Sequence, residues 1–572
     1  MIRDEIAHLV REAARAAQRA GELPAVTLPE VEVERPRLPE NGDYATNLAL
    51  RLKKAVAGPG APIDLARVLV KHVPASPMIR EATAAMPGFV NFFLSDRWLQ
   101  QQVEMIIAAG EQFGASQLGA GRRIQVEFVS ANPTGPLHVG NGRGSVTGST
   151  LAAVLQSAGY EVEREYYVND AGTQTDVFGR TLYARYLQLF GVDASVPEDG
   201  YPGEYMVEIA RSIKAQHGDR FLGPVDAPPP PLLKELGIER VIGMIRDDLA
   251  LIGVRYDRWF SERSLFGPEE GGGSESLYQR VMRMLKERGH TVEREGAVWF
   301  TSAGGEQDKD DVLVRTGGAP TYFASDIAYH YDKFAVRGFD RVVDIWGADH
   351  PGHVARLMRA MDALGIDPGR LTILLYQLVT LKRGNQVVRL AKRAGEIITL
   401  REVVEEVGPD AVRFFFLMRS PDAAMDFDLE LAKRQSDENP VFYVQYAHAR
   451  IAGILRNAAQ AGVSDEGGDV TLLTHPSELN LVRTILRLPE LLDDAARRLE
   501  VHGLPHYALT LATDFHAFYR DCRVLTDDVE LSRARLKLVH AARVTFARVL
   551  GLMGVSAPER MLRADEAEPA PS

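Results

Sequence analysis

The sequence predicts an α/β protein in which a Rossmann-like parallel-sheet domain lies between an N-terminal α+β domain and a C-terminal all-α helical bundle. Three observations predict this fold class. Residues 123–168 have the pattern strand, glycine-rich turn, helix, strand, which is the βαβ unit of a parallel sheet. Residues 341–378 repeat the strand–helix–strand order. From about residue 438 onward the chain is almost strand-free and rich in Ala, Leu and Arg, which favours a helical bundle.

The first domain is expected over residues 1–116. Residues 1–20 (MIRDEIAHLVREAARAAQRA) form an amphipathic pattern without the apolar run and cleavage site of a signal peptide. A proline-rich stretch follows and leads into the turn-like segment 41–44. Residues 88–94 (GFVNFFL) predict a strand. These patterns together indicate a small α+β domain.

The second domain is expected over residues 117–435. Its first strand is Arg123–Val129, where β-branched and apolar residues alternate, and the loop 132–136 (NPTGP) cannot be helical. The remaining elements follow from the same patterns: a helix over Val146–Gly159, a strand over Tyr160–Val168, then strand Arg341–Trp346, helix His350–Leu364 and strand Leu371–Leu378. An insertion is expected between the two halves, at about residues 197–314.

The third domain is expected over residues 436–572, as helices packed in a bundle. Its last residues, 564–572, are polar and are expected to be disordered. Basic side chains crowd the last long helical segment and are either phosphate contacts or a solvated face. They are Arg533, Arg535, Lys537, Arg543 and Arg548.

Composition limits the classes of function. The chain has 572 residues and a formal net charge of −12, which is weak evidence against a nucleic-acid partner because a local basic groove can sit on an acidic protein. No apolar run approaches the roughly 20 residues of a membrane span. A single cysteine, Cys522, excludes an internal disulfide and an all-cysteine metal site. We therefore expect a cytoplasmic protein without a membrane.

Two motifs suggest nucleotide chemistry. Residues 130–141 (SANPTGPLHVGN) follow a strand and open a helix, so that Gly140 lets the backbone approach a ligand and the helix N-terminus attracts phosphate. His138 is placed to donate to a phosphate oxygen, although a tight βα turn with an incidental histidine explains the pattern equally well. Residues 388–395 (VRLAKRAG) place Lys392 in a small-residue loop. A lysine there neutralises phosphates as pyrophosphate leaves, unless it belongs to an ordinary solvated basic turn.

Together the two motifs resemble the HIGH and KMSKS signatures of class I aminoacyl-tRNA synthetases. Four further stretches resemble arginyl-tRNA synthetases and span most of the chain: 42–47 (GDYATN), 167–174 (YVNDAGTQ), 322–327 (YFASDI) and 439–450 (NPVFYVQYAHAR). The resemblance implies a ligase that activates L-arginine with ATP to arginyl-adenylate and pyrophosphate, then transfers arginine to the 3′ end of tRNA(Arg). By the same resemblance the first domain contacts the tRNA elbow and the third binds the anticodon.

The resemblance also implies roles for individual residues. The expected catalytic residues are His138, Asn141 and Lys392. The expected ATP-binding residues are His138, Gly140, Asn141, Gly347, Asp349 and Lys392. The expected arginine-binding residues are Ser130 and Asn132 near the α-amino group, Tyr322 and Asp326 at the guanidinium, and Glu262 and His350. The expected tRNA-binding residues are Asp43, Tyr44, Asn47, Tyr443, Tyr446 and Arg450, although a turn explains Asp43 and Tyr44 equally well.

The pairing of Tyr322 with Asp326 has a physical reason of its own. Residues four apart lie on one helix face, and a carboxylate is the planar partner that a guanidinium prefers. Two departures from the family signatures are visible: Asn141 replaces the final histidine of HIGH, and Lys392 is the only lysine kept from KMSKS. The cation at the phosphates is therefore preserved.

Three rival functions are weighed. A synthetase for another amino acid would not suit Asp326, a non-catalytic tRNA-binding paralogue would not need His138, Lys392 and Asp326 together, and a small-molecule nucleotidyltransferase would have little use for the third domain. We expect Mg²⁺ to accompany ATP, without a dedicated protein metal site, and we expect a monomer.

Overall fold

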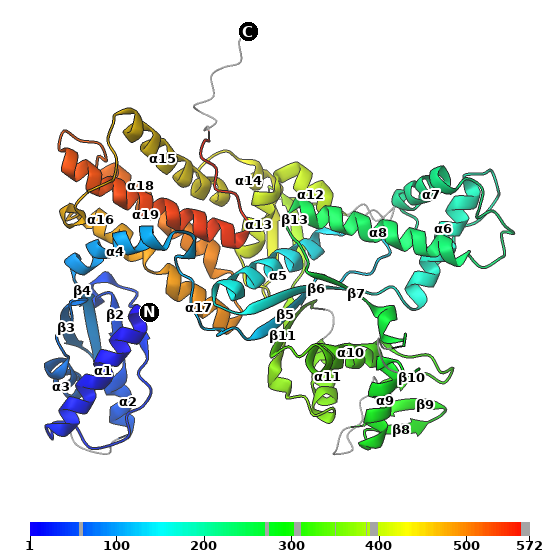
Figure 1. Ribbon diagram of the computed structural model, residues 1–572, viewed down its shortest axis with the longest axis horizontal. Coiled ribbons are helices and arrows are strands. Elements are labelled where there is room, and N and C mark those ends of the chain that lie inside the picture. Colours follow the sequence, from blue (N-terminus) through cyan, green and yellow to red (C-terminus); the bar gives the residue numbers. More distant parts are fainter. Residues whose placement is uncertain are drawn as a thin grey trace, which may run out of the picture.

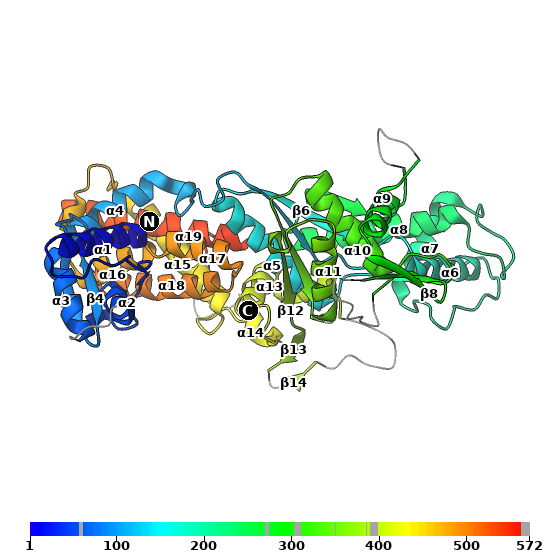
Figure 2. The same ribbon diagram turned by 90° about the horizontal axis from the view of Figure 1, so that it is seen from below.

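The computed structural model describes residues 1–55, 61–268, 274–301, 311–348, 351–384, 386–388 and 398–561. The molecule is elongated (Figures 1 and 2). The first domain and the helical bundle lie at one end, the parallel sheet lies in the middle, and a helical arm extends at the other end.

The central sheet is parallel and confirms the predicted Rossmann-like fold. Its strands run in the order β12–β11–β5–β6–β7. They are β5 (Arg123–Phe128), β6 (Glu161–Val168), β7 (Arg258–Ser261), β11 (Arg341–Gly347) and β12 (Leu371–Tyr376). In a sheet of this topology, ligands bind beyond the carboxyl ends of the strands, where the strand order reverses. Here the order reverses between β5 and β11.

The prediction of one insertion at about residues 197–314 is wrong in one respect. Strand β7 lies inside that range but belongs to the central sheet. Two separate excursions flank it. The first is the arm α6 (Thr173–Gln188), α7 (Glu204–His217) and α8 (Pro231–Leu251); the second is α9 (Leu277–Glu287) with β8 (Thr291–Arg294), β9 (Ala297–Phe300) and β10 (Val312–Val314). The β7 segment RWFS is only 4 residues long, which is too short for a periodic signal.

Helix α5 (Val139–Ser157) begins directly after His138, earlier than the predicted Val146. The sequence pattern predicts a turn for the small residues at the start of this helix. In the structure they are helical and allow neighbouring side chains to pack closely against α5. A Cβ on Gly148 would lie 2.2 Å from the Phe128 ring, and one on Gly144 would lie 2.9 Å from the Tyr376 ring. The glycines therefore let α5 lie directly against the sheet and its neighbours.

The first domain contains α1 (Ile2–Arg19), α2 (Leu48–Ala55) and α3 (Pro62–His72) against an antiparallel sheet. That sheet has the order β1 (Val33–Glu34), β2 (Tyr44–Thr46), β4 (Phe89–Leu94) and β3 (Ile79–Ala85). The next helix, α4 (Asp96–Ala109), lies along the bundle instead (Figure 1). Its Gln100 amide donates to the carbonyls of Thr471 (3.1 Å) and Leu473 (2.9 Å). Helix α4 therefore joins the first domain to the third.

The rest of the second domain connects the sheet to the bundle. It consists of α10 (Tyr322–Tyr331), the π-helical turn η4 (Asp332–Val336), α11 (Pro351–Ala363), β13 (Val379–Arg383), β14 (Gln386–Val387), α12 (Leu400–Val407), α13 (Pro409–Leu417), β15 (Met425–Asp428) and α14 (Leu429–Lys433). The bundle consists of α15 (Pro440–Gln460), α16 (Pro476–Ile485), α17 (Leu488–Arg498), α18 (Gly503–Asp521) and α19 (Val529–Met553). Cys522 is buried in it. Among the described residues, no helix is long and apolar enough to cross a membrane.

Candidate functional site

The loop after β5 has an unusual backbone. Val129 has φ 69° and Ser130 has φ 41°, a region that β-branched residues rarely occupy and that is frequent at functional sites. Two hydrogen bonds hold Ser130 there: its Oγ donates to Glu127 Oε1 (2.8 Å) and accepts from the Tyr167 backbone N–H (3.1 Å). The loop is therefore fixed at the point where the strand order reverses.

His138 caps the N-terminus of α5. Its Nδ1 accepts from the Gly140 N–H (3.1 Å), and the Asn141 side-chain oxygen accepts from the His138 N–H (3.1 Å). Burial lowers the pKa of the His138 imidazole, so the ring is neutral near pH 7 and Nε2 carries the proton. Nε2 is then a donor at a helix N-terminus, where anions are favoured.

The segment that follows the KMSKS-like motif pairs with the start of α5. Val139 N–H donates to the Ile398 carbonyl (3.3 Å), and Leu400 N–H donates to the Leu137 carbonyl (2.8 Å). The residues that follow the KMSKS-like loop therefore lie beside the start of α5. Lys392 itself, like Asp349 and His350, lies outside the described residues. Gly347 ends β11, next to the reversal of strand order.

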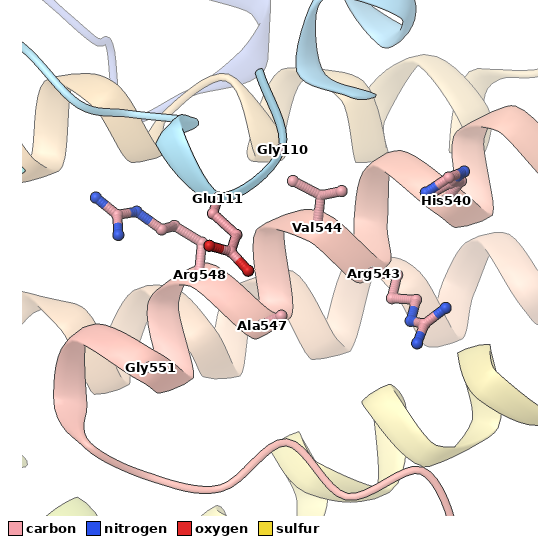
Figure 3. Close-up of a pocket in the computed structure, with 8 residues that line it drawn as sticks. All are labelled: Gly110, Glu111, His540, Arg543, Val544, Ala547, Arg548 and Gly551. Atoms are coloured by element: carbon pink, nitrogen blue, oxygen red, sulfur yellow. The ribbon is translucent and has the colours of Figure 1, made fainter. Parts of the chain in front are cut away.

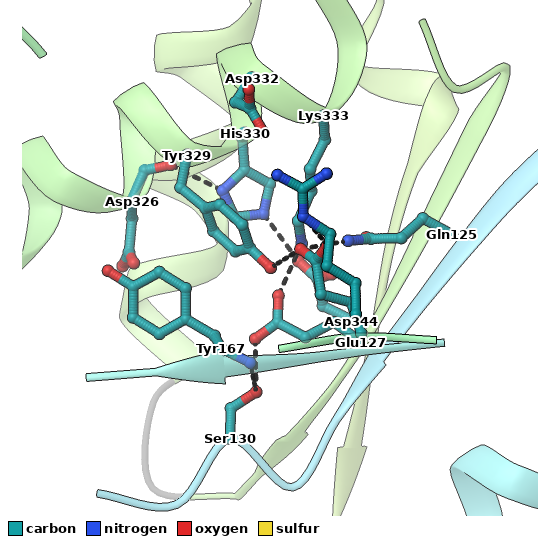
Figure 4. Close-up of polar contacts among 12 residues, drawn as sticks. Gln125, Glu127, Ser130, Tyr167, Asp326, Tyr329, His330, Asp332, Lys333 and Asp344 are labelled. Carbon is teal, nitrogen blue, oxygen red and sulfur yellow. Dashed lines mark hydrogen bonds and ion pairs between the residues drawn. The ribbon is translucent and has the colours of Figure 1, made fainter. Parts of the chain in front are cut away.

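An acidic pocket lies beyond the ends of β6 and β7. It is formed by Glu262, Asp326 and Asp170. Burial raises the pKa of the Tyr167 phenol, and the charges of these three carboxylates and of Glu127 raise it further. Figure 4 shows Asp326 beside Tyr167. Glu262 is only 4% exposed. Burial, opposed by the Ser325 hydroxyl and reinforced by Asp326 and Asp170, raises the pKa of Glu262 to about 7.

The pocket includes residues that sequence reasoning did not identify. His353 Nε2 donates to Asp326 Oδ2 (2.5 Å), while its Nδ1 accepts from Arg356 Nε (2.9 Å). In the orientation that satisfies its hydrogen bonds, the Asn169 amide donates to Glu262 Oε2 (2.6 Å) and lies 3.1 Å from the Asn132 side chain. Tyr167, Asn169 and Asp170 lie in the stretch 167–174, whose family resemblance was the one available signal. Nothing in the sequence pattern indicated His353.

The expected pair at the start of α10 is only partly formed. Asp326 faces the pocket with a side chain that is 27% exposed. Tyr322 is 49% exposed, and Asp326 is held by His353 instead. The acidic pocket and the loop at Ser130 lie side by side, because Tyr167 contacts both.

In the first domain, the structure argues against Tyr44 as a tRNA contact. Tyr44 is completely buried, and its hydroxyl donates to Glu490 Oε1 of α17 (2.7 Å). A side chain without exposed surface cannot contact tRNA in this arrangement, so Tyr44 joins the first domain to the third. Asp43 also joins them, through Arg483 (2.8 Å). Asn47 is partly exposed, immediately before α2.

An aromatic and basic cluster lies on α15 and α18. Arg450 Cζ lies 4.8 Å from the Tyr446 ring centroid and 5.1 Å from that of Tyr519. Tyr443 stacks at a tilt on His516, with 5.0 Å between ring centroids. The three residues expected from sequence, Tyr443, Tyr446 and Arg450, are therefore brought together with two that were not, His516 and Tyr519.

The basic residues of α19 are engaged within the protein. Arg535 pairs with Glu478 (2.7 Å) and Arg543 with Glu559 (2.7 Å), and Arg548 donates to Ser157 Oγ (2.5 Å). Arg543 and Arg548 also line a cavity of about 440 Å³ between α19 and residues 110–111 (Figure 3). Their partners favour a structural role over phosphate binding.

Comparisons with known proteins agree with this arrangement. Residues 3–94 match the family model "Arginyl tRNA synthetase N terminal domain", residues 102–189 match "tRNA synthetases class I (R), catalytic domain", and residues 444–561 match "DALR anticodon binding domain".

Relatives match along nearly the whole chain. An arginine–tRNA ligase of Dehalococcoides mccartyi (strain CBDB1) is 50% identical over 561 residues, which are 98% of this chain and 99% of the relative. One from Heliobacterium modesticaldum is 47% identical, with coverage of 98% and 99%. Among solved structures, a putative arginyl-tRNA synthetase of Campylobacter jejuni has a TM-score of 0.74 at 32% identity, with 82% of this chain and 100% of that chain covered. Arginyl-tRNA synthetase of Thermus thermophilus has a similar fold, with a TM-score of 0.73 at 23% identity and coverage of 98% and 100%.

Proposed function

The chain belongs to the arginyl-tRNA synthetase family, and we propose from this premise how its site activates L-arginine with ATP and charges tRNA(Arg). The enzyme is a class I arginine–tRNA ligase of translation. The observation that supports the substrate best is the acidic pocket. The negative charges of Glu262, Asp326 and Asp170 all act on the Tyr167 phenol there, and such a pocket suits a cationic side chain and repels an acidic one.

Arginine is proposed to lie between the acidic pocket and the loop after β5. Its guanidinium pairs with Asp326 and Glu262, and Tyr322 lines the entrance. Its α-amino group lies near Ser130 and Asn132. Glu262 is held by Ser325 and Asn169, so the pocket is pre-organised before the ligand arrives. His350 is a further candidate, outside the described residues.

ATP is proposed to lie over the N-terminus of α5. The His138 Nε2–H donates to a phosphate, Gly140 permits close approach, and the Asn141 oxygen is used in the helix cap, which leaves its NH₂ group to donate to the nucleotide. Gly347 and Asp349 border the adenosine side. The arginine carboxylate attacks the α-phosphate in line and pyrophosphate leaves as Lys392 neutralises it. The terminal ribose hydroxyl of tRNA then attacks the acyl carbon and AMP leaves. Positioning and charge neutralisation account for the rate.

The tRNA is proposed to contact the helical bundle through its anticodon and the first domain through its elbow. The aromatic and basic cluster at Tyr443, Tyr446 and Arg450 suits unpaired anticodon bases, because bases stack on aromatic rings and guanidinium planes; Tyr443 and Arg450 are its partly exposed members, and the buried Tyr446 supports Arg450 from below. In the first domain, Asn47 remains a candidate, whereas Asp43 and Tyr44 are engaged with the third domain. Residues 1–116, 117–435 and 436–572 are proposed as the three domains.

Mg²⁺ is proposed to enter bound to the phosphates of ATP. Among the described residues, no group of three or more His, Cys, Asp or Glu side chains is arranged to hold a metal ion. Magnesium in such sites keeps several waters and relies on substrate phosphates. We also propose that the protein is a cytoplasmic monomer, and sedimentation equilibrium of the purified protein tests the oligomeric state.

The deciding experiment is ATP–pyrophosphate exchange with each of the amino acids, with and without tRNA(Arg). Exchange that requires arginine supports the function. Exchange with another amino acid at equal efficiency, or tRNA binding without any exchange, would contradict it and favour a different synthetase or a non-catalytic paralogue.

A further inference from the structure

A buried lysine lies beneath the proposed arginine site. Lys333 is 0% exposed; its ammonium donates to Glu127 Oε2 (2.6 Å) and Asp344 Oδ1 (2.8 Å), and it lies 4.2 Å from the Tyr329 ring centroid. Figure 4 shows these groups together, to the right of Tyr167 and Asp326. A fully buried cation is costly unless it is paired on every side. Nothing in the proposed reaction uses this residue directly.

A local departure from α-helical geometry brings Lys333 to this position. Helix α10 ends at Tyr331 and continues as the π-helical turn η4, a feature that is frequent at functional sites. Arg337, just after this turn, pairs with Asp332 (2.7 Å) and Glu163 (3.0 Å), and also with Glu165. The turn is therefore held from outside while Lys333 contacts β5 and β11.

Two chains of hydrogen bonds lead from Lys333 toward the proposed arginine site. The first reaches the end that would hold the α-amino group. Glu127 uses one carboxylate oxygen for Lys333 and the other for Ser130 Oγ (2.6 and 2.8 Å). Ser130 has the positive φ described above and needs such support. A change at Lys333 therefore acts on Ser130 through a single carboxylate.

The second chain of hydrogen bonds reaches the end of the site that would hold the guanidinium group. Asp344 Oδ2 accepts from His330 Nε2 (2.7 Å), and His330 Nδ1 lies 2.7 Å from the Asp326 carbonyl oxygen. The His330 ring therefore bridges the Asp344 carboxylate and the backbone of Asp326. Lys333 is the cation that lies between the Glu127 and Asp344 carboxylates. This chain of hydrogen bonds fixes the backbone of Asp326, whose carboxylate is proposed to bind the guanidinium.

We propose that Lys333 is a positioning residue that sets the distance between the two ends of the arginine pocket and thereby selects the length of the amino-acid side chain. This inference rests on the proposed function, because it takes Ser130 as the amino end and Asp326 as the guanidinium end. A pocket with a fixed separation discriminates between arginine and homoarginine, which is one methylene longer. A pocket without that constraint adapts to both.

The test compares arginine with homoarginine in tRNA-stimulated ATP–pyrophosphate exchange. In Lys333→Met we expect kcat/KM for arginine to fall about 10- to 100-fold, the size typical of a small misplacement of bound substrate. The preference for arginine over homoarginine should fall at least about fivefold, and KM for ATP should change less than about threefold. The control is Arg337→Met, which disturbs the same turn but pairs with Asp332, Glu163 and Glu165.

A second variant separates positioning from stability. Lys333→Met removes the cation between the buried carboxylates of Glu127 and Asp344, whereas the double variant Lys333→Met/Glu127→Gln removes one of these carboxylates as well. We expect the double variant to recover much of any lost thermal stability and to keep the reduced arginine preference. Recovery of the preference together with stability, an unchanged preference in either Lys333 variant, or an equal loss of preference in Arg337→Met would overturn the proposal. Failure of the wild-type protein to use arginine at all would instead refute the proposed function.

Discussion

Replacing Glu262 with glutamine is expected to stabilise the ligand-free protein and to weaken arginine binding. The pKa of this buried carboxyl is raised from 4.5 to about 7, and a tenfold change in proton affinity corresponds to 1.36 kcal/mol. Holding Glu262 ionised above pH 7 therefore costs the folded state up to about 3 kcal/mol. Glutamine keeps the shape and removes the charge, but it satisfies the surrounding donors less well, so we expect a net gain of about 1 to 3 kcal/mol.

The sign of the pH dependence follows from the raised pKa. In the wild-type protein the stability associated with Glu262 is fully present below pH 4.5 and is lost as the pH rises through about 7. The stability difference between Glu262→Gln and wild type should therefore be near zero at pH 4.5 and largest above pH 7. Urea unfolding at pH 5 and pH 8 measures it. A variant that is less stable than wild type at pH 8, or a difference that does not depend on pH, would refute the reasoning.

Arginine binding should show the converse effect. The guanidinium favours ionised Glu262, of which about one tenth is present at pH 6, one unit below the raised pKa. We expect the wild-type affinity for arginine to fall about tenfold between pH 8 and pH 6, and the affinity of Glu262→Gln to be lower and nearly independent of pH. Calorimetric titration with arginine measures both. A flat wild-type profile would show that Glu262 does not contact the ligand's charge.

Three further changes test other parts of the site. Asp326→Asn should raise KM for arginine by more than about tenfold, because a guanidinium that loses its charged partner costs several kcal/mol, and should leave KM for ATP unchanged in steady-state exchange; an unaltered arginine KM would contradict the assignment. Lys392→Ala should slow single-turnover adenylate formation about 10²- to 10³-fold with nearly normal arginine affinity, and a rate within twofold of wild type would exclude its role. Tyr44→Phe removes the hydrogen bond to Glu490 and should cost about 1 to 2 kcal/mol in thermal or urea unfolding without changing KM for tRNA; a raised KM at unchanged stability would restore Tyr44 as a tRNA contact.

Local sequence patterns predicted most strands of the parallel sheet. They did not predict the buried hydrogen bonds around Lys333. Strands β5, β6, β11 and β12 alternate or run apolar over six or more residues, so periodicity finds them, whereas β7 is too short. Sequence spacing predicted that Tyr322 and Asp326 share a helix face, and the family resemblance alone predicted that Asp326 binds arginine, which stays a prediction. Lys333 pairs with Glu127 across 206 positions, and His353 reaches Asp326 across 27. Such contacts depend on strand order and on the π-helical turn, which no residue pattern in the chain indicated.

The same tertiary contacts decide how tRNA binding by the third domain should be tested. Arg413 of α13 donates to the carbonyls of Met553 (2.5 Å) and Ile252 (2.7 Å), so it ties the bundle to the arm of the catalytic domain. Gln100 of α4 depends on the bundle as well. A chain that ends before the bundle would remove the Met553 partner of Arg413 and both carbonyl partners of Gln100, at about 1 to 3 kcal/mol for each unsatisfied group, and would lose stability for reasons unrelated to tRNA.

Arg450→Ala is the sharper perturbation, because Arg450 stacks on Tyr446 and the partly exposed Tyr519 at the surface of α15 and α18. Losing one stacked guanidinium at a base-binding surface costs about 1 to 3 kcal/mol, so we expect KM for tRNA(Arg) to rise about 5- to 150-fold while the unfolding midpoint stays close to that of wild type. Arg543 lies on the neighbouring helix α19, and Arg543→Ala, which breaks its pair with Glu559, is the matched control. If both variants raise KM equally, the bundle binds tRNA through general charge; if neither does, the anticodon lies elsewhere on the bundle.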